Sequence, residues 1–279
     1  MQGNQIKKAI FSFLISFFLW PLGLFFILSA VQNASAQDAD PTPTPQASNA
    51  EGAEEDPTKP IGFSIRNEYR NLRSGAWANG VIFRFDQVVF RKLQNPGGLK
   101  GLILRFDVPM NTLHIGTTTR TGLGDIYAQA IYVPRASRGF SFAVGSGFVL
   151  PTATNTVLGT GKLLLAPTAV PIWNFPKSKR RLLIRFQNVF SVAGKSSRPD
   201  INYFVAAPAV IGHLYKKWWY TADTEFRWNW KSHLGSAVSG FLVGRLVKGK
   251  YGIAFKPEVL WGPGRAGDFN LKFAVFKIR

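Results

Sequence analysis

Charged side chains recur two residues apart in segments that otherwise alternate polar and apolar residues. This spacing puts them on one face of a β-strand, because successive side chains of a strand point to opposite faces. The polar residues that follow the pattern, here called the charged ladder, are Arg84, Asp86, Arg105, Asp107, Asp125, Tyr127, Arg185, Asp223, Glu225, Arg227, Arg245, Lys256, Glu258 and Lys272. Rows of acids and bases on one face could form ion pairs, set the ion selectivity of a pore, or transfer protons.

Two interpretations of the charged ladder stay open. In the first, the ladder lines a pore, where rings of charge select among ions, and Asp223, Glu225 and Arg227 form the constriction. In the second, acids and bases neutralise one another and fill the interior of a small barrel. Asp223 and Glu225 share a face, but among so many Arg and Lys residues we expect them in ion pairs rather than in acid–base catalysis.

Hydrolytic and metal chemistry lack the residues that they need. None of His114, His213 and His233, which we place in loops or turns, has a serine two positions away on the same strand face, and Ser232 next to His233 would point to the opposite face. Residues 156–163 fail the phosphate-loop pattern at its first glycine and after its lysine. The chain has no cysteine and no metal-ligand spacing, so we expect no catalytic residue, no metal and no cofactor.

The strand predicted over residues 217–231 shows the two faces most clearly. One face carries Asp223, Glu225 and Arg227, and the other is aromatic at both ends and small in the middle. A transmembrane barrel strand presents such a face to lipid, with aromatic girdles at the two interfaces. The lipid-facing girdle is predicted to contain Trp218, Tyr220, Phe226, Trp228, Tyr251 and Trp261.

From Ile61 onward, segments of about ten alternating residues are followed by turns, and no useful stretch has the period of a helix. The predicted strands are 63–70, 80–90, 101–109, 124–133, 139–150, 163–172, 182–192, 201–212, 217–230, 236–247, 250–261 and 269–278. We therefore predict an all-β fold, an antiparallel transmembrane β-barrel of about twelve strands. Pro167, Pro171 and Pro208 fall inside strands and predict a bulge or a shortened strand around 163–172.

A soluble β-sandwich would show the same alternation with its apolar face inside. Aromatic residues at strand ends, an export signal and connections of alternating length favour the barrel, whose long loops lie outside and whose short turns lie in the periplasm. The connections predicted to be long are 71–79, 110–123 and 151–162, and those predicted to be short are 134–138, 213–216 and 248–250.

Two segments precede the barrel, which we assign to residues 61–279. Lys7 and Lys8 before an apolar run, and Ala34-Ser35-Ala36 after it, predict a cleaved signal peptide over residues 1–36, with an uncleaved anchor as the alternative. Residues 37–60 are rich in proline and acids and hold no aromatic residue, so they predict a disordered linker.

The net charge is strongly positive. The chain has 34 Lys and Arg against 15 Asp and Glu, and residues 61–279 alone hold 31 bases and 9 acids, a balance of +22. Because export separates the protein from nucleic acid, we expect no nucleic-acid partner. We expect instead phospholipid headgroups and lipopolysaccharide outside the barrel, or an anionic solute inside it.

Four short segments carry a resemblance to a known family. They are Gly122-Leu123-Gly124-Asp125, Gly145-Ser146-Gly147, Leu150-Pro151-Thr152 and Leu158-Gly159-Thr160-Gly161. With them, most of residues 61–279 resembles the outer-membrane family named for the phenol meta-cleavage pathway, the MetA-like transporters. The resemblance implies a barrel that passes small, often hydrophobic compounds, and it supplies no functional residues. The basic balance and the long signal region of this chain depart from the family.

These observations favour a channel in the outer membrane of a Gram-negative bacterium, for passive passage of small hydrophobic or anionic molecules, without enzymatic activity. The alternative is a closed structural or surface-interaction barrel with a plugged lumen, whose function resides in loops 110–123, 151–162 and 193–200. An outer-membrane lipid hydrolase comes third, because no activated nucleophile is recognisable.

Overall fold

The computed structural model describes residues 61–94, 98–136, 139–214, 217–247 and 251–278. The predicted signal peptide and linker, residues 1–60, lie outside the described residues. Within the described ranges, no helix is both long enough and apolar enough to cross a membrane.

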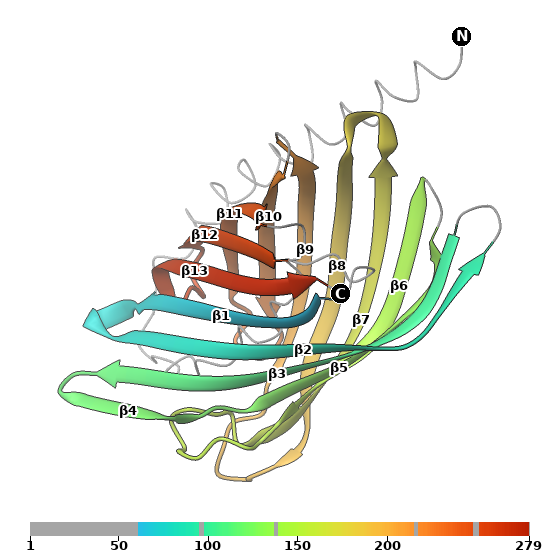
Figure 1. Ribbon diagram of the computed structural model, residues 1–279. Coiled ribbons are helices and arrows are strands. Elements are labelled where there is room, and N and C mark those ends of the chain that lie inside the picture. The colour runs from blue at the N-terminus through green and yellow to red at the C-terminus, as the bar shows by residue number, and fades with distance from the viewer. Residues whose placement is uncertain (1–60, 95–97, 137–138, 215–216, 248–250, 279) are drawn as a thin grey trace. The chain divides into compact units, whose positions relative to one another are not determined.

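The described chain is built from strands (Figure 1). In order they are β1 (Ile61–Leu72), β2 (Trp77–Gln94), β3 (Gly98–Ile115), β4 (Thr118–Leu123), β5 (Ile126–Ala136), β6 (Phe140–Leu150), β7 (Lys162–Phe175), β8 (Arg180–Gly194), β9 (Asn202–His213), β10 (Trp218–Asn229), β11 (Gly235–Val247), β12 (Tyr251–Trp261) and β13 (Gly267–Ile278). Two short 3-10 helices, η2 (Arg73–Gly75) and η3 (Pro176–Ser178), form connections.

The strands close into a barrel. Consecutive strands pair antiparallel except β4 and β5, and β1 also pairs with β13, which joins the two ends of the sheet. β3 pairs with β4 near its end and with β5 near its beginning, so β4 and β5 together occupy one position in the sheet. The predicted twelve-stranded antiparallel barrel is therefore confirmed, with one strand interrupted at residues 124–125. Among the described strands, closure leaves β4 alone with a partner strand on one side only.

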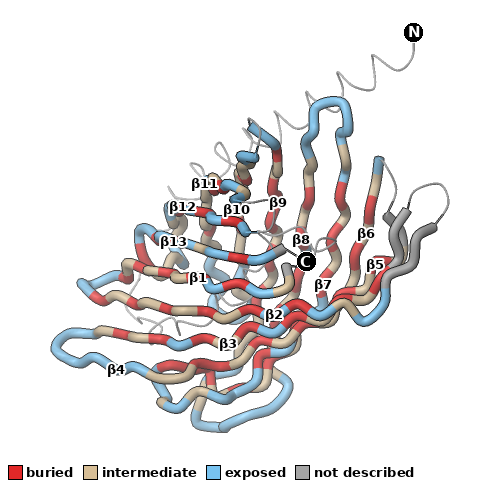
Figure 2. The backbone as a smooth tube through the Cα atoms, in the orientation of Figure 1, coloured by how far each residue is buried: buried red, intermediate tan, exposed pale blue. Residues whose placement is uncertain are grey.

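Burial alternates along the strands, as Figure 2 shows. In β12, Ala254, Lys256 and Glu258 are buried, whereas Phe255 and Val259 on the other face are 50% and 61% exposed. In this strand the charged residues face the interior and the large apolar residues face outward. This is the inverse of a soluble sandwich, which buries its apolar face and exposes its charges, so the sandwich alternative is excluded.

The prolines of β7 do not shorten it, contrary to one of the predicted outcomes. The strand runs for 14 residues, and its pairing with β6 continues through Pro167 and Pro171. The register with β8 skips residues 166–167 and 170–171, where the missing proline N–H would otherwise be needed. An irregularity does occur in β7, but between Leu163 and Leu164.

Two connections predicted to be long are short. β1 ends at Leu72 and β2 begins at Trp77, and β3 and β4 form a hairpin around Gly116, so most of 71–79 and 110–123 is strand. Gly75 and Gly116 adopt positive φ angles of 74° and 59°, which permits the tight turns. The third, 151–161, is irregular as predicted, and 195–201 is a further extended connection. The connections predicted to be short lie partly or wholly outside the described residues.

Candidate functional site

Nearly all of the charged ladder lies on the inner face of the barrel, as predicted. Its members are buried except for Asp223, Arg227 and Arg245. The side chains of Asp223 and Arg227 also face inward and keep 15% and 19% of their surface exposed. The structure thus brings the predicted residues together around one interior, while their contact with a passing solute stays a prediction.

Arg245 is the exception, and its predicted inward orientation is wrong. It is exposed, and its guanidinium carbon lies 5.3 Å from the ring centroid of Trp218 on the outer face. The two faces of β11 are exchanged relative to the prediction: Leu242 is buried, and a β-carbon on Gly240 would come within 2.4 Å of the Lys256 side chain. Small and apolar residues occupy both faces of β11, so a period of two alone cannot identify its inner face.

Two buried Arg–Asp pairs join β2 to β3. Arg84 donates to both carboxylate oxygens of Asp107, at 2.7 Å each, and Arg105 donates to both oxygens of Asp86, at 2.8 and 2.9 Å. The register places each arginine directly opposite its aspartate. Because two parallel hydrogen bonds fix the relative orientation of the groups, these four residues form a rigid part of the inner wall.

β1 contributes three buried charged residues that were not predicted from the sequence. They are Arg66, Glu68 and Arg70, and Arg66 Nε lies 2.5 Å from Glu68 Oε1. In the sequence these three residues alternate with residues 65, 67 and 69, so the period of two is present. The outer face of β1 also carries Asn67, which reduces the contrast between the two faces.

Glu225 on β10 is the centre of a network that reaches β8. It accepts hydrogen bonds from Arg185 and, at 2.6 Å, from Arg227 Nε. Arg185 also donates to Gln187 at 2.7 Å, and the Arg227 guanidinium lies 5.6 Å from the ring centroid of Tyr203. Arg227 is thereby held on the interior while part of its side chain remains accessible to solvent.

Asp223, two residues away on β10, belongs to a second network. Lys256 Nζ lies 2.8 Å from Asp223 Oδ2 and 2.8 Å from Glu258 Oε1. Glu258 also receives Lys272 Nζ at 2.9 Å and the Asn270 side-chain amide at 3.0 Å. The three residues predicted as the constriction thus lie together on β10 but belong to two networks, with Glu225 and Arg227 in one and Asp223 in the other.

Asp125 faces inward, but its carboxylate binds a loop and is not exposed to the lumen. Its carboxylate accepts hydrogen bonds from the backbone N–H groups of Ala153 (3.0 Å) and Thr160 (2.7 Å) and from the Thr160 hydroxyl (2.8 Å). The connection 151–161 is thereby fixed to the interruption between β4 and β5. Leu158 of this connection is fully buried against inward-facing Leu72, Ala78 and Leu113 of β1, β2 and β3 and against Ala76, so the loop lies inside this mouth of the barrel.

Three of the four segments that carry the family resemblance, 122–125, 150–152 and 158–161, meet at this anchor. Thr152 Oγ1 donates to the Gly124 carbonyl at 3.1 Å and accepts from the Ile126 N–H at 2.9 Å. A β-carbon on Gly124 would come within 2.3 Å of the Asn111 side chain, and one on Gly159 within 2.5 Å of Asp125. A side chain at residue 159 would therefore collide with the Asp125 anchor, and one at residue 124 would displace the Asn111 side chain.

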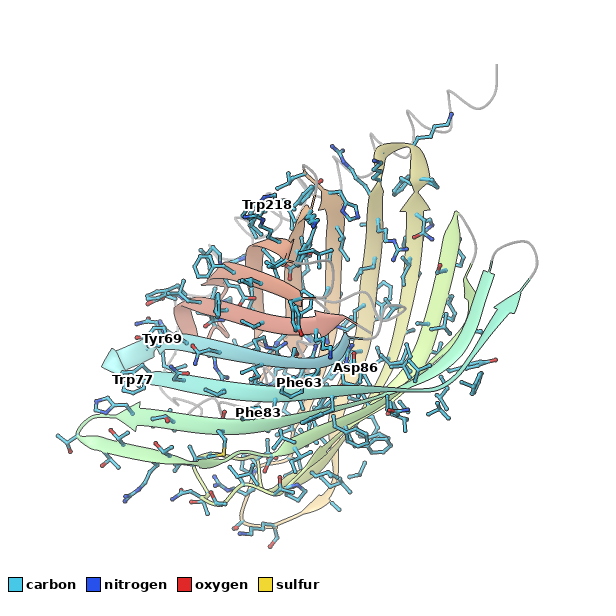
Figure 3. The ribbon with its side chains drawn as sticks, viewed as in Figure 1. Phe63, Tyr69, Trp77, Phe83, Asp86 and Trp218 are labelled. Atoms are coloured by element: carbon cyan, nitrogen blue, oxygen red, sulfur yellow. The ribbon has the colours of Figure 1, made fainter. Side chains whose placement is uncertain are left out.

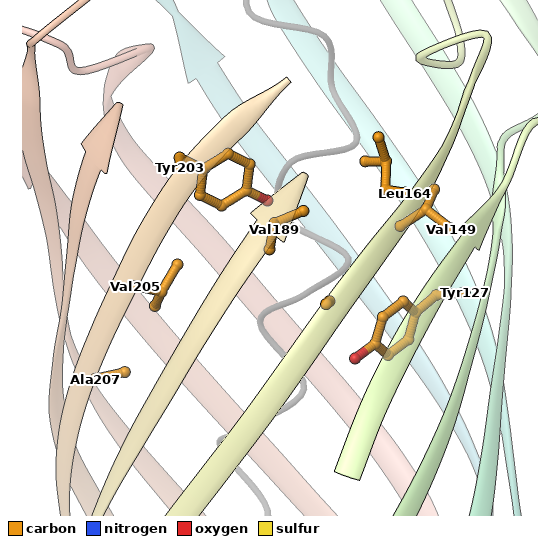
Figure 4. Close-up of a cluster of buried hydrophobic side chains, with 8 residues drawn as sticks. Tyr127, Val149, Leu164, Val189, Tyr203, Val205 and Ala207 are labelled. Atoms are coloured by element: carbon orange, nitrogen blue, oxygen red, sulfur yellow. The ribbon is translucent and has the colours of Figure 1, made fainter. Parts of the chain in front are cut away.

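The inner faces of β5 to β9 carry an apolar wall. Figure 4 shows its larger cluster, and a second cluster continues it along the same strands. The larger cluster contains Tyr127, Val149, Leu164, Ala166, Val189, Tyr203, Val205 and Ala207. The interior therefore has an apolar part and, on β1 to β3 and β10 to β13, a charged part.

The predicted girdle lies on the outer face. Trp218, Trp228 and Tyr251 are 39%, 40% and 46% exposed. The other members pair with aromatic neighbours: the Tyr220 ring stacks at 5.9 Å on Phe241, and Phe226 meets Trp261 edge to face at 5.8 Å. Figure 3 shows such side chains along the strands, with Phe63, Tyr69, Trp77 and Trp218 labelled. Their contact with lipid stays a prediction.

The histidines are not grouped with one another or with a candidate nucleophile. His114 lies in β3 rather than in a loop, where its ring stacks on Trp77 at 5.3 Å and its Nδ1 lies 2.8 Å from Thr119 Oγ1. His213 is the last residue of β9, and His233 occupies a turn with a φ of 56°. Across the described part of the chain, no group of three His, Asp or Glu residues is placed to hold a metal ion.

Comparisons with known proteins bear on the fold. No family model and no curated protein matches the sequence. Among solved structures, the COG4313 outer membrane channel from Pseudomonas putida F1 aligns with a TM-score of 0.66 and 12% identity, over 82% of this chain and 98% of that chain. This chain has the fold of an outer-membrane channel.

Two porins share that fold less closely. The KdgM porin aligns with a TM-score of 0.53 and 8% identity, over 78% of this chain and 98% of that chain. The NanC porin aligns with a TM-score of 0.51 and 11% identity, over 78% and 99%. At these identities the likeness concerns the fold, and the resemblance to the MetA-like family is not confirmed by a sequence match.

Proposed function

We propose that this protein is a channel of the bacterial outer membrane, through which small solutes diffuse passively. The observation that carries the proposal is a closed twelve-stranded barrel with its apolar face outside and its charged face inside. Only a closed barrel or a helix satisfies its backbone hydrogen bonds within lipid, and the exposed apolar exterior needs lipid to cover it. Solved channels and porins with the same fold support the proposal.

The interior suits small molecules with both an apolar and a charged part. The apolar wall on β5 to β9 would contact the former, and the charged part, where Asp223 and Arg227 reach solvent, would contact the latter. The described buried residues include eight bases and six acids. The interior is therefore only mildly basic, and we infer a weak preference for anions rather than the strong one that the total charge suggests.

A plugged barrel is the second candidate, and specific observations favour it. Arg84, Arg105 and Glu68 are 1%, 2% and 0% exposed, and the connection 151–161 lies inside one mouth. Such a molecule would act through its surface loops rather than through its interior.

Liposome swelling distinguishes the two candidates. Proteoliposomes are diluted into isotonic solutions of a neutral sugar, a small aromatic carboxylate or a matched aromatic amine. A channel of the proposed kind admits the carboxylate faster than the amine. The entry rate of neutral sugars should fall steeply as the size of the sugar increases. Swelling no faster than that of protein-free liposomes in all three solutions would support the plugged barrel.

A further inference from the structure

Basic residues are distributed unequally between the two ends of the barrel. At the end where β1 begins and β13 ends, the described residues of 88–104, 133–143, 173–184, 211–221, 243–253 and 274–278 include eleven Lys and Arg and no Asp or Glu. We call this the basic end. At the opposite end, Asp200 lies 2.9 Å from Lys162 and 3.5 Å from Lys231, and Asp268 lies 3.3 Å from Arg265. The charge at that end is thus partly neutralised.

Three basic residues of the basic end face outward. Arg180 on β8, Arg245 on β11 and Lys277 on β13 are exposed and stand on the same side of their strands as the apolar exterior. Within the described residues none of the three forms a salt bridge. They point toward the surroundings of the barrel and not toward its interior.

Each of the three has an aromatic residue directly opposite it on a neighbouring strand. Arg180 pairs with Phe175, and Arg245 pairs with Trp218. Lys277 lies between Tyr251 on one side and Phe63 on the other. A base next to an outward aromatic ring is the arrangement found where a membrane protein meets the headgroup layer, because the ring sits at the interface and the cation reaches the phosphates.

We propose that Arg180, Arg245 and Lys277, with these aromatic neighbours, form a belt that binds the headgroups of anionic phospholipids. The three bases lie on β8, β11 and β13, which are not neighbours in the barrel and together span about half of its circumference. A leaflet surrounds the barrel and can contact all three at once. A solute inside the lumen would reach none of them.

The basic end identifies which lipid is bound. Both described connections of more than five residues, 151–161 and 195–201, lie at the opposite end. In outer-membrane barrels the longer loops are extracellular and the short turns are periplasmic. The belt therefore faces the inner leaflet, which consists of phospholipids, and not lipopolysaccharide. This inference rests on the barrel spanning a bilayer, as proposed above, but not on its conducting solutes.

Native mass spectrometry tests the belt directly. The full-length protein in detergent is mixed with equal amounts of phosphatidylglycerol and phosphatidylcholine, and the lipids retained after detergent is removed in the gas phase are counted. The wild type should retain phosphatidylglycerol preferentially. In the variant R180Q/R245Q/K277Q, the ratio of retained phosphatidylglycerol to phosphatidylcholine should fall about five-fold for each base removed. This is the factor expected for one basic residue at an anionic surface.

Two matched variants control for total charge and for folding. The variant R73Q/R120Q/K195Q removes the same charge from exposed residues at the opposite end and should keep the preference. The charge-conserving variant R180K/R245K/K277R should also keep most of it. Equal retention of both lipids by the wild type, or an equal loss of preference in R73Q/R120Q/K195Q, would overturn the belt. A protein that conducts no solute but selects phosphatidylglycerol would leave the belt standing and contradict only the channel.

Discussion

Arg227 and Arg245 have similar chemistry but lie on opposite sides of the barrel wall. Arg227 lies inside, bonded to Glu225, and Arg245 lies outside against Trp218. If solutes cross the interior, replacing Arg227 with Gln should shift the reversal potential toward cations, because a positive charge leaves the path. The variant R227K should retain most of the wild-type selectivity.

The outer arginine is the control for that measurement. R245Q removes the same charge from the protein but leaves the interior unchanged, so its reversal potential should equal that of the wild type. A shift in R245Q as large as the shift in R227Q would show that selectivity does not arise from the interior network.

Glu225 neutralises two guanidinium groups, and this gives a prediction about stability. In E225Q, Arg185 and Arg227 lose their shared carboxylate inside the barrel. Removing one partner of a buried ion pair costs about 3–5 kcal/mol, so E225Q should unfold at a clearly lower urea concentration. D268N, at the partly exposed pair with Arg265, should change the urea midpoint little. A midpoint of E225Q equal to that of the wild type would contradict the network.

Asp200 gives a pH dependence outside the barrel interior. The hydrogen bond from Lys162, and then the charges of Lys162 and Lys231, lower the pKa of Asp200 below its ordinary value of 3.8. A lowered pKa means that ionised Asp200 stabilises the folded connection above pH 3.8, and that this stabilisation is lost as the pH falls through the lowered pKa.

Hydrogen exchange of the backbone amides in 195–201 measures this effect. After correction for the intrinsic rate, protection should fall on acidification below pH 3.8 in the wild type. D200N should show the lower protection already at neutral pH and no further fall. Protection in the wild type that does not depend on pH would rule out a role for this ion pair in ordering the connection.

At the scale of elements, the connection 151–161 depends on a single carboxylate. D125N keeps the shape of the side chain but weakens its hydrogen bonds to Ala153 and Thr160, because a charged acceptor is replaced by a neutral amide. The connection should leave the mouth more often, which should increase both proteolytic cleavage within 151–161 and the conductance. T152V tests the neighbouring bonds to Gly124 and Ile126 and should have a smaller effect.

Strands were predictable from the sequence because a period of two is a local property. The twelve predicted strands correspond to the twelve positions in the barrel, and the ladder residues of β2, β3, β10 and β12 face inward as predicted. β11 was assigned with its faces exchanged because glycine, serine and apolar residues occupy both of its sides. Its inner glycines, Gly240 and Gly244, accommodate side chains of the neighbouring strands, among them Lys256 and Trp219, and a single strand does not contain that information.

The partners within the interior could not be predicted from the same pattern. The sequence shows that Glu225 and Arg227 share a face, but the bond from Arg185 joins residues that are 40 positions apart and lie on strands separated by β9. The anchoring role of Asp125 likewise depends on how the connection 151–161 folds back. Such contacts follow from the register and curvature of the whole barrel rather than from any one segment.

At the scale of the whole molecule, the charged residues are divided between the interior of the barrel and its ends and exterior. Seven of the nine acids in residues 61–279 lie inside the barrel, where they meet nine bases among the residues whose burial is described. Most of the remaining described positive charge lies on the two ends and the exterior. This division explains why total charge is a poor guide to the solute. It also places the largest uncompensated positive charge at the basic end, where the lipid belt is proposed.

Planar-bilayer recording tests the central claim, that solutes cross the interior of this barrel. Purified protein is added to one side of a bilayer under a salt gradient, and current is recorded over a range of voltages. We predict discrete conductance steps with a weak preference for anions that is reduced or reversed in R227Q. The absence of steps at every voltage, from protein that has inserted into the bilayer, would contradict the channel and leave the plugged barrel.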